Sequence, residues 1–205
     1  MTKLTKFSMT KVIFFDYHGV LDRHNFQEML EMLAKESFKQ GDFGVYRQSF
    51  YEKYAVLCNA YAAGQILPEH FWSKLLKDGL DIDLLSKARD YILTIEKNQD
   101  LIKQINAIKK RFELGILSDC PLDKLEFLKN SWQLKRYFKH TLFSSEIGLD
   151  KQDPEYFLEM QYQTKYQRSE IFYIDENPEN VSVAKKLGFE AVVYNDKIDL
   201  VKYFN

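Results

Sequence analysis

Five short apolar runs, each bounded by polar or turn-forming residues, constrain the fold of this 205-residue chain more than any other feature. They lie at residues 12–15, 113–117, 140–143, 171–174 and 190–194. Runs of this length and composition are typical of buried strands. From the second run onward, one helix-length segment separates each run from the next, which is the alternation expected of βαβ units. The sequence therefore predicts an α/β fold with a doubly wound, Rossmann-like parallel sheet.

The helices between these runs have recognisable ends. Pro154 and Pro178 each stand where a first helical residue would fall, and Asp153 and Asn177 immediately before them are suitable N-cap residues. Gly188 follows a basic stretch and is suited to end a helix before the last run.

The segment between the first and second runs breaks the alternation, because its apolar residues recur only at helical spacing. It predicts one helix before Gly41, one before Gly64, one from Pro68 to about Lys77 and a fourth around residues 84–95. Four short amphipathic helices would form a bundle inserted after the first strand. We therefore expect a catalytic core made of residues 1–21 and 98–205, and a helical cap made of residues 22–97.

Composition and charge limit the kinds of partner and the cellular location that we expect for this chain. The formal net charge is -1 and no block of like charges occurs, so the pattern of a nucleic-acid-binding protein is missing. No apolar stretch approaches the length of a membrane span. Cys58 and Cys120 lie far apart without metal-site spacing, which favours reduced thiols and a cytoplasmic location. The sequence leaves the oligomeric state open.

Polar side chains follow three of the five apolar runs. The chain has Asp16 after the first, Ser118 and Asp119 after the second, and Asp175 and Glu176 after the fourth. Doubly wound sheets bind ligands at the carboxyl ends of their strands, so we expect these groups to converge on one edge. Lys151 stands in a loop just before a predicted helix.

These segments resemble the motifs of one family. The stretch 14–21 resembles the first motif of the haloacid dehalogenase superfamily, an apolar strand followed by Asp-x-Asp-Gly-(Thr/Val). Residues 117–119 resemble the second motif, the loop 145–154 with Lys151 resembles the third, and residues 174–180 resemble the fourth. The insert resembles the family's type-1 cap. Residues 64–72 further resemble the cap of the branch that contains sugar-phosphate phosphatases and the amino-terminal phosphatase domain of soluble epoxide hydrolases.

The resemblance implies a magnesium-dependent phosphatase that hydrolyses a small soluble phosphate monoester. Asp16 would attack phosphorus and form an aspartyl phosphate, which water then hydrolyses. Mg²⁺ would be held by Asp16, by the backbone carbonyl of His18, and by Asp175 or Glu176. The substrate phosphate would be bound by residues from the second and third motifs, namely Ser118, Asp119 and Lys151.

The match departs from the family at His18, where the phosphatases carry the Asp that transfers protons. An imidazole can perform both proton transfers near neutral pH, and neighbouring carboxylates would favour its charged form. One alternative is a weakened site in a binding or regulatory protein. Another is a metal-free dehalogenase, although the Asp175-Glu176 pair argues for a cation. Asp119 stands where the family commonly has Asn, and nothing in the sequence explains it.

Overall fold

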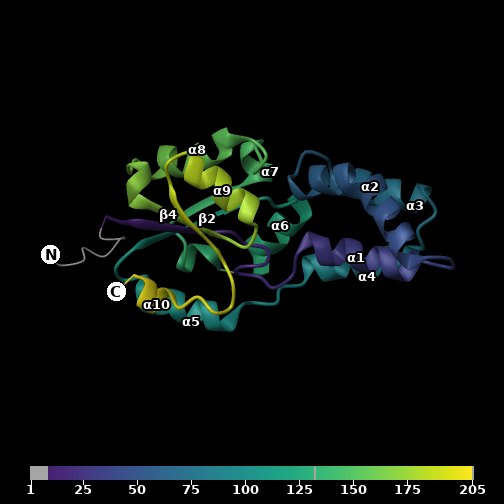
Figure 1. Cartoon of the computed structure of the whole chain (residues 1–205), viewed down its shortest axis with the longest axis horizontal. Helices are drawn as coiled ribbons and strands as arrows, with labels where there is room; N and C mark the ends of the chain where they lie inside the picture. Colours follow the sequence, from purple (N-terminus) through teal and green to yellow (C-terminus); the bar gives the residue numbers. More distant parts are fainter. Residues whose placement is uncertain (1–8, 132, 205) are drawn as a thin grey trace.

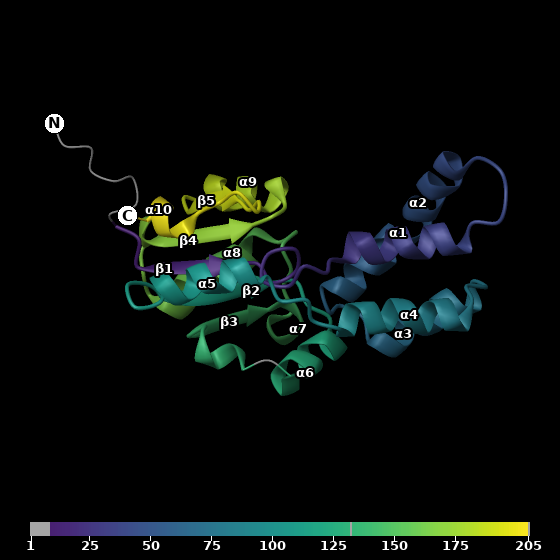
Figure 2. The same cartoon turned by 90° about the horizontal axis from the view of Figure 1, so that it is seen from below.

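The computed structural model describes residues 9–131 and 133–204, in which a parallel sheet lies beside an elongated group of helices (Figures 1 and 2). Within these residues the sheet has five strands in the order β3-β2-β1-β4-β5. The strands are β1 (Val12–Phe15), β2 (Glu113–Ser118), β3 (His140–Phe143), β4 (Ile171–Asp175) and β5 (Glu190–Val193). All neighbouring pairs are parallel. The predicted fold class is confirmed, and each strand end lies within one residue of its expected place.

Helices cover both faces of the sheet, because alternate strand residues point to opposite sides. Ile13 and Phe15 pack with residues of α5 (Gln99–Ile108), α6 (Leu122–Ser131) and α10 (Leu200–Tyr203). Val12 and Phe14 pack with residues of α8 (Pro154–Thr164) and α9 (Pro178–Lys186) on the other face. The remaining short elements are α7 (Ser144–Ile147), η1 (Leu134–Arg136) and η2 (Arg168–Glu170).

The helix ends follow the sequence signals. Asp153 accepts a hydrogen bond from the Glu155 amide at the start of α8, and Asn177 accepts one from the Glu179 amide at the start of α9. Gly188 has a positive φ of 92° just after α9, a conformation that favours glycine. The predicted caps are therefore confirmed.

The strand order creates a switch point beside β1. The chain runs outward from β1 through β2 and β3 on one side, and through β4 and β5 on the other. Connections on the two sides diverge at the carboxyl ends of β1 and β4, which is where doubly wound sheets bind their ligands. Asp16 directly follows β1, Asp175 is the last residue of β4, and Ser118 is the last residue of the neighbouring strand β2.

We call the four helices that follow β1 the helical insert: α1 (Phe26–Ser37), α2 (Phe43–Ala62), α3 (Pro68–Lys77) and α4 (Ile82–Leu93). They share a hydrophobic cluster separate from those of the sheet. The fourth helix ends before Ile95, which packs against the cluster of the sheet instead. Two adjacent segments join the insert to the sheet: the Arg23 amide donates to the Glu96 carbonyl (2.8 Å), and the Asn98 amide to the Leu21 carbonyl (2.9 Å). We keep the division into a core and a cap of residues 22–97 as a proposal.

Gly64, just after α2, marks a close approach between the insert and α7. A Cβ built there would lie 2.4 Å from the Ser145 Cβ, and the residue has a φ of +73°. We expect Gly64→Ala to lower the free energy of unfolding by about 1–3 kcal/mol more than Gly79→Ala does. Gly79 is the matched control because it has a φ of +90° and nothing within 4 Å of its built Cβ. Urea unfolding of both variants measures the difference, and equal losses would show that the contact with Ser145 contributes nothing.

Candidate active site

A buried ammonium group lies between two carboxylates at the carboxyl edge of the sheet. The Lys151 Nζ is 2.7 Å from Asp16 Oδ1 and 2.9 Å from Asp175 Oδ2. All three residues are buried. Burial raises the pKa of Asp16, which Lys151 opposes and Asp175 reinforces. Although burial works against its charged form, the pKa of Lys151 is raised by Asp16 and Asp175. The predicted convergence of the first, third and fourth motifs therefore occurs in the structure.

The Asp175 carboxylate is saturated by donors. Its Oδ1 accepts from the Asn177 amide (2.7 Å) and from Asn180 Nδ2 (3.2 Å). Its Oδ2 accepts from Lys151 Nζ, from Asn180 Nδ2 (3.0 Å) and from the Tyr173 hydroxyl. Burial disfavours the charged form, but the Lys151 ammonium and these donors keep the pKa of Asp175 below its usual range. Asp175 thus orients Lys151 and has little lone-pair capacity left.

Glu176 has the opposite character. Its Oε2 is buried and has no hydrogen-bond partner. Three carboxylate oxygens, one from each of Asp16, Asp175 and Glu176, lie within 4.8 Å of one another. Burial, and then the charges of Asp16 and Asp175, raise the pKa of Glu176 to about 10. A carboxyl group held protonated by nearby negative charge becomes an anionic ligand when a cation joins it. The residues therefore fit a divalent metal ion that prefers oxygen ligands, such as Mg²⁺.

His18 is buried beside this cluster, and its ring makes one polar contact. Nδ1 lies 3.2 Å from the Asp119 carbonyl oxygen, whereas Nε2 is buried without a partner. A carbonyl can only accept, so the neutral ring carries its proton on Nδ1 and leaves a lone pair on Nε2. Burial, followed by the charges of Lys124 and Lys151, lowers the pKa of His18. The expectation that nearby carboxylates favour the charged imidazole is therefore wrong, because burial and two ammonium groups outweigh them.

Ser118 and Asp119 end β2 beside these groups. The Ser118 Oγ donates to the Asp119 carbonyl (3.1 Å), and the Tyr156 hydroxyl donates to the Ser118 carbonyl (2.8 Å). The Asp119 Oδ1 accepts from the Lys151 amide at 3.1 Å, so this side chain positions the loop that carries the lysine. Burial, reinforced by Asp16 and opposed by Lys151, raises the pKa of Asp119 to about 7.

The helical insert contacts the sheet close to the site. The Tyr61 hydroxyl at the end of α2 donates to Asp123 Oδ1 (3.0 Å) on α6. The Gln65 side-chain amide donates to Asp150, the residue before Lys151. The Phe26 ring lies 4.9 Å from the His18 ring, centroid to centroid. Side chains of the insert therefore lie close to the groups at the strand ends.

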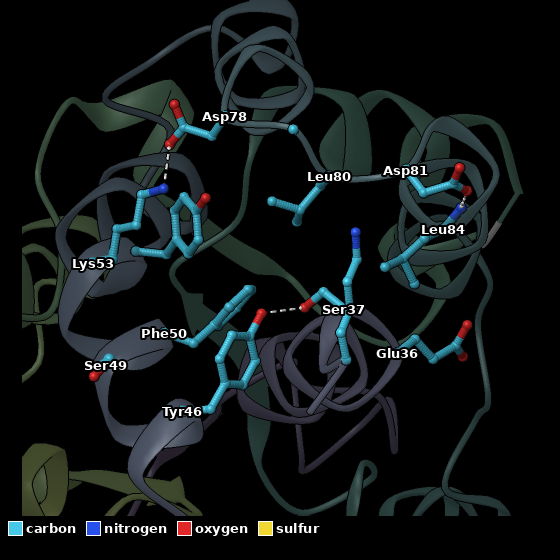
Figure 3. A pocket seen from close by; sticks show the side chains of 13 residues that line it. Glu36, Ser37, Tyr46, Ser49, Phe50, Lys53, Asp78, Leu80, Asp81 and Leu84 are labelled. Carbon is cyan, nitrogen blue, oxygen red and sulfur yellow. Dashed lines mark hydrogen bonds and ion pairs between the residues drawn. The ribbon is translucent and has the colours of Figure 1, made fainter. Parts of the chain in front are cut away.

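The insert also holds a cavity of about 480 Å³ that is distinct from this site (Figure 3). Phe50 and Tyr46 lie on one side of it and Leu80 on another, and the Lys53–Asp78 ion pair (3.2 Å) stands at its wall. None of the strand-end residues lines this cavity. It lacks the cluster of acidic, hydroxyl and ammonium groups that the sequence predicts.

Sequence reasoning missed the residues that support the site. Tyr173 could have been found, because a residue two positions before Asp175 on the same strand faces the same side of the sheet. Asn180 lies in the first turn of α9 and had no distinguishing signal. No sequence signal indicated the burial of Lys124 on α6, since an isolated lysine in an amphipathic helix usually lies on the solvent side.

Strand order, switch point and acidic cluster together are those of a doubly wound α/β enzyme, with a candidate site at the carboxyl edge of the sheet. More specifically, the chain belongs to the haloacid dehalogenase-like hydrolases, whose family model matches residues 13–194. The resemblance found in the four motifs is thereby confirmed. A curated relative, flavin mononucleotide hydrolase 1 of Arabidopsis thaliana, named as chloroplastic, is 23% identical over 182 residues, which cover 85% of this chain and 73% of the relative.

Solved structures share the fold at low identity. A haloacid dehalogenase family enzyme of Bacteroides thetaiotaomicron, solved as a magnesium complex, has a TM-score of 0.75 at 18% identity and covers 97% of this chain and 100% of its own. The same enzyme was also solved with magnesium and inorganic phosphate (TM-score 0.72, 18% identity, 96% and 100% covered). The L-2-haloacid dehalogenase of Xanthobacter autotrophicus has a TM-score of 0.61 at 17% identity, covering 94% and 81%.

Among the described residues, no helix combines the length and apolar character needed to cross a membrane. The cytoplasmic location stays a prediction.

Proposed function

We propose that this hydrolase is a magnesium-dependent phosphatase that acts on a small phosphate monoester through an aspartyl phosphate at Asp16. The observation that carries the proposal is the pairing of a buried Lys151 ammonium with Asp16 and Asp175, next to a buried and unpartnered Glu176 Oε2. An array with more carboxylates than ammonium groups has use for a cation, and with a cation bound it would be suited to an anionic substrate.

The chain's own groups account for the two chemical steps. A carboxylate oxygen of Asp16 attacks phosphorus, the bond from phosphorus to the leaving oxygen breaks, and the leaving group takes up a proton from solvent water. Lys151 offsets the negative charge of the phosphoryl oxygens that are held beside the carboxylates. A water molecule then attacks the phosphorus atom and His18 Nε2 accepts its proton, so that the bond between Asp16 and phosphorus breaks and inorganic phosphate leaves.

Asp16, Glu176 and the backbone carbonyl of His18 would hold the metal ion, which when bound supplies positive charge beside the transferring phosphoryl group. Asp175 would act on Lys151 instead, because its oxygens are already engaged. Ser118 and the amides that begin α6 would bind phosphate oxygens, since the first amides of a helix lack intrahelical partners.

The relatives support a phosphate ester as the substrate. The curated relative is named a flavin mononucleotide hydrolase, and the Bacteroides enzyme was solved with magnesium and inorganic phosphate. We therefore propose to measure hydrolysis over a panel of phosphate monoesters that includes flavin mononucleotide, sugar phosphates and an aryl phosphate. Hydrolysis that requires Mg²⁺ would support the proposal. No turnover over the panel would favour a binding protein, and halide release without metal would favour the dehalogenase alternative.

His18→Ala tests the base in the second step. We expect kcat for an aryl phosphate to fall by about 10²–10³-fold, because general-base assistance contributes on this order. An aryl leaving group needs little protonation, so the first step should persist and rapid mixing should show a burst of one phenol per site. His18→Asp should restore part of the steady rate. A full steady rate in His18→Ala, without a burst, would contradict the role of the imidazole.

A further inference from the structure

Lys124 on α6 carries a buried ammonium group that the proposed chemistry does not use. Its side chain is 0% exposed. The Nζ lies 3.0 Å from Asp22 Oδ2, 2.7 Å from the Ile92 carbonyl oxygen and 2.8 Å from the Thr94 carbonyl oxygen. An ammonium group has three protons, and all three find an acceptor here.

These acceptors come from both segments that join the helical insert to the sheet. Asp22 lies in the segment that enters the insert, and its Oδ1 also accepts from the Glu96 amide (2.9 Å) in the segment that leaves it. The Ile92 and Thr94 carbonyls stand at the end of α4. The last carbonyls of a helix lack intrahelical partners, and a cation there is favourable. Lys124 thus joins the entering segment, the leaving segment and α6 at one point.

The position of α6 makes this junction relevant to the strand-end site. This helix packs on the sheet through Leu125 and Leu128, and it contacts α4 of the insert. In Figures 1 and 2, α6 lies on the side of the sheet that faces the insert. A buried ion pair is a poor source of stability, because two charges must leave water, and its best-attested use is to fix one arrangement of the chain.

We propose that Lys124 is a positioning residue at the hinge of the helical insert, where it holds both connecting segments on α6. With the two segments tied at this junction, the insert moves relative to Asp16 and His18 as one body. Without the ammonium group the segments separate and the insert samples a wider range of positions. The effect on catalysis rests on the proposed phosphatase function, whereas the tie between the segments does not.

Hydrogen exchange tests the tie without requiring activity. We expect Lys124→Met to speed amide exchange in residues 22–26 and 92–98 by about tenfold or more, because hydrogen bonds to a charged group are lost. Amides of β1, β2 and β4 should keep their protection. The matched control is Lys129→Met on the same helix, since Lys129 is exposed and its one ion pair among the described residues is with Glu146 (2.6 Å). Exchange equal to that of the control, or a uniform increase that includes the strands, would overturn the proposal.

A second variant covers the case in which Lys124→Met fails to fold. Asp22→Asn combined with Lys124→Met removes both buried charges at similar volume, so no unpaired charge remains. The α4 carbonyls still lose their donor, and we expect the same local increase in exchange. Full protection of both segments in the double variant would overturn the proposal.

Kinetics tests the consequence for the site once phosphatase activity has been found. Hinge substitutions commonly change kcat and KM together, so we expect both to change in Lys124→Met and neither in Lys129→Met. Unchanged constants in a folded Lys124→Met protein would overturn the link between the hinge and catalysis. If no phosphatase activity is found at all, the exchange result still decides whether Lys124 ties the segments.

Discussion

Asp16→Asn is expected to lower the magnesium-dependent hydrolysis of an aryl phosphate by at least about 10⁴-fold, because it removes the group that attacks phosphorus. A carboxamide cannot form the acyl phosphate. The fold should persist, since Lys151 keeps its contact with Asp175 at 2.9 Å. Steady-state rates measure the loss, and acid quenching after brief exposure to labelled substrate should find phosphate on the wild-type protein only.

Asp153→Asn is the matched control for this change of carboxylate to carboxamide. Asp153 caps α8 through the Glu155 amide (2.9 Å), a role that Asn performs equally well. We expect its kcat and KM to equal those of the wild type. Activity retained in Asp16→Asn within tenfold of the wild type would exclude an aspartyl phosphate at this position.

The fold and the centre of the site could both be predicted from the sequence, because both depend on where the strands lie and end. Apolar runs of strand length specify a parallel sheet, and the carboxyl ends of parallel strands meet at one edge. Asp16 follows β1 and Asp175 ends β4, and these strands are neighbours in the sheet, so the proximity of the two residues follows from topology alone. Lys151 lies in a loop, and only its resemblance to the third motif indicated that it joins them.

The division of roles at the site could not be predicted, because it depends on which donors reach each oxygen. Asp175 and Glu176 are adjacent in sequence, yet one is saturated by donors and the other has a buried Oε2 without a partner. The prediction of the charge state of His18 was wrong for a similar reason. Its burial and the nearby ammonium groups are properties of the packed structure, whereas the sequence displayed only the adjacent acidic motifs. Asp119 now has a role in the structure, since it accepts from the Lys151 amide.

Glu176→Gln is expected to raise the Mg²⁺ concentration for half-maximal activity on the order of 100-fold, because a neutral amide replaces an anionic ligand. Asp175→Asn should instead lower stability, since Lys151 and the Tyr173 hydroxyl would lose their charged acceptor. Activity titrated with Mg²⁺, together with urea unfolding in the presence of a chelator, separates the two variants. Equal dependence on Mg²⁺ in Glu176→Gln and the wild type would contradict the assignment of this ligand.

The pH dependence of metal binding tests the same assignment independently. The pKa of Glu176 is raised to about 10 by burial and then by Asp16 and Asp175. The folded protein without metal therefore holds a proton on Glu176 that the unfolded chain has lost above its usual pKa. Its stability then falls as pH rises from that value toward the folded pKa. Because metal binding must expel this proton, Mg²⁺ affinity should increase between pH 6 and 9 in the wild type. Calorimetry in buffers of different ionisation enthalpy measures the released proton, and Glu176→Gln should abolish most of that release.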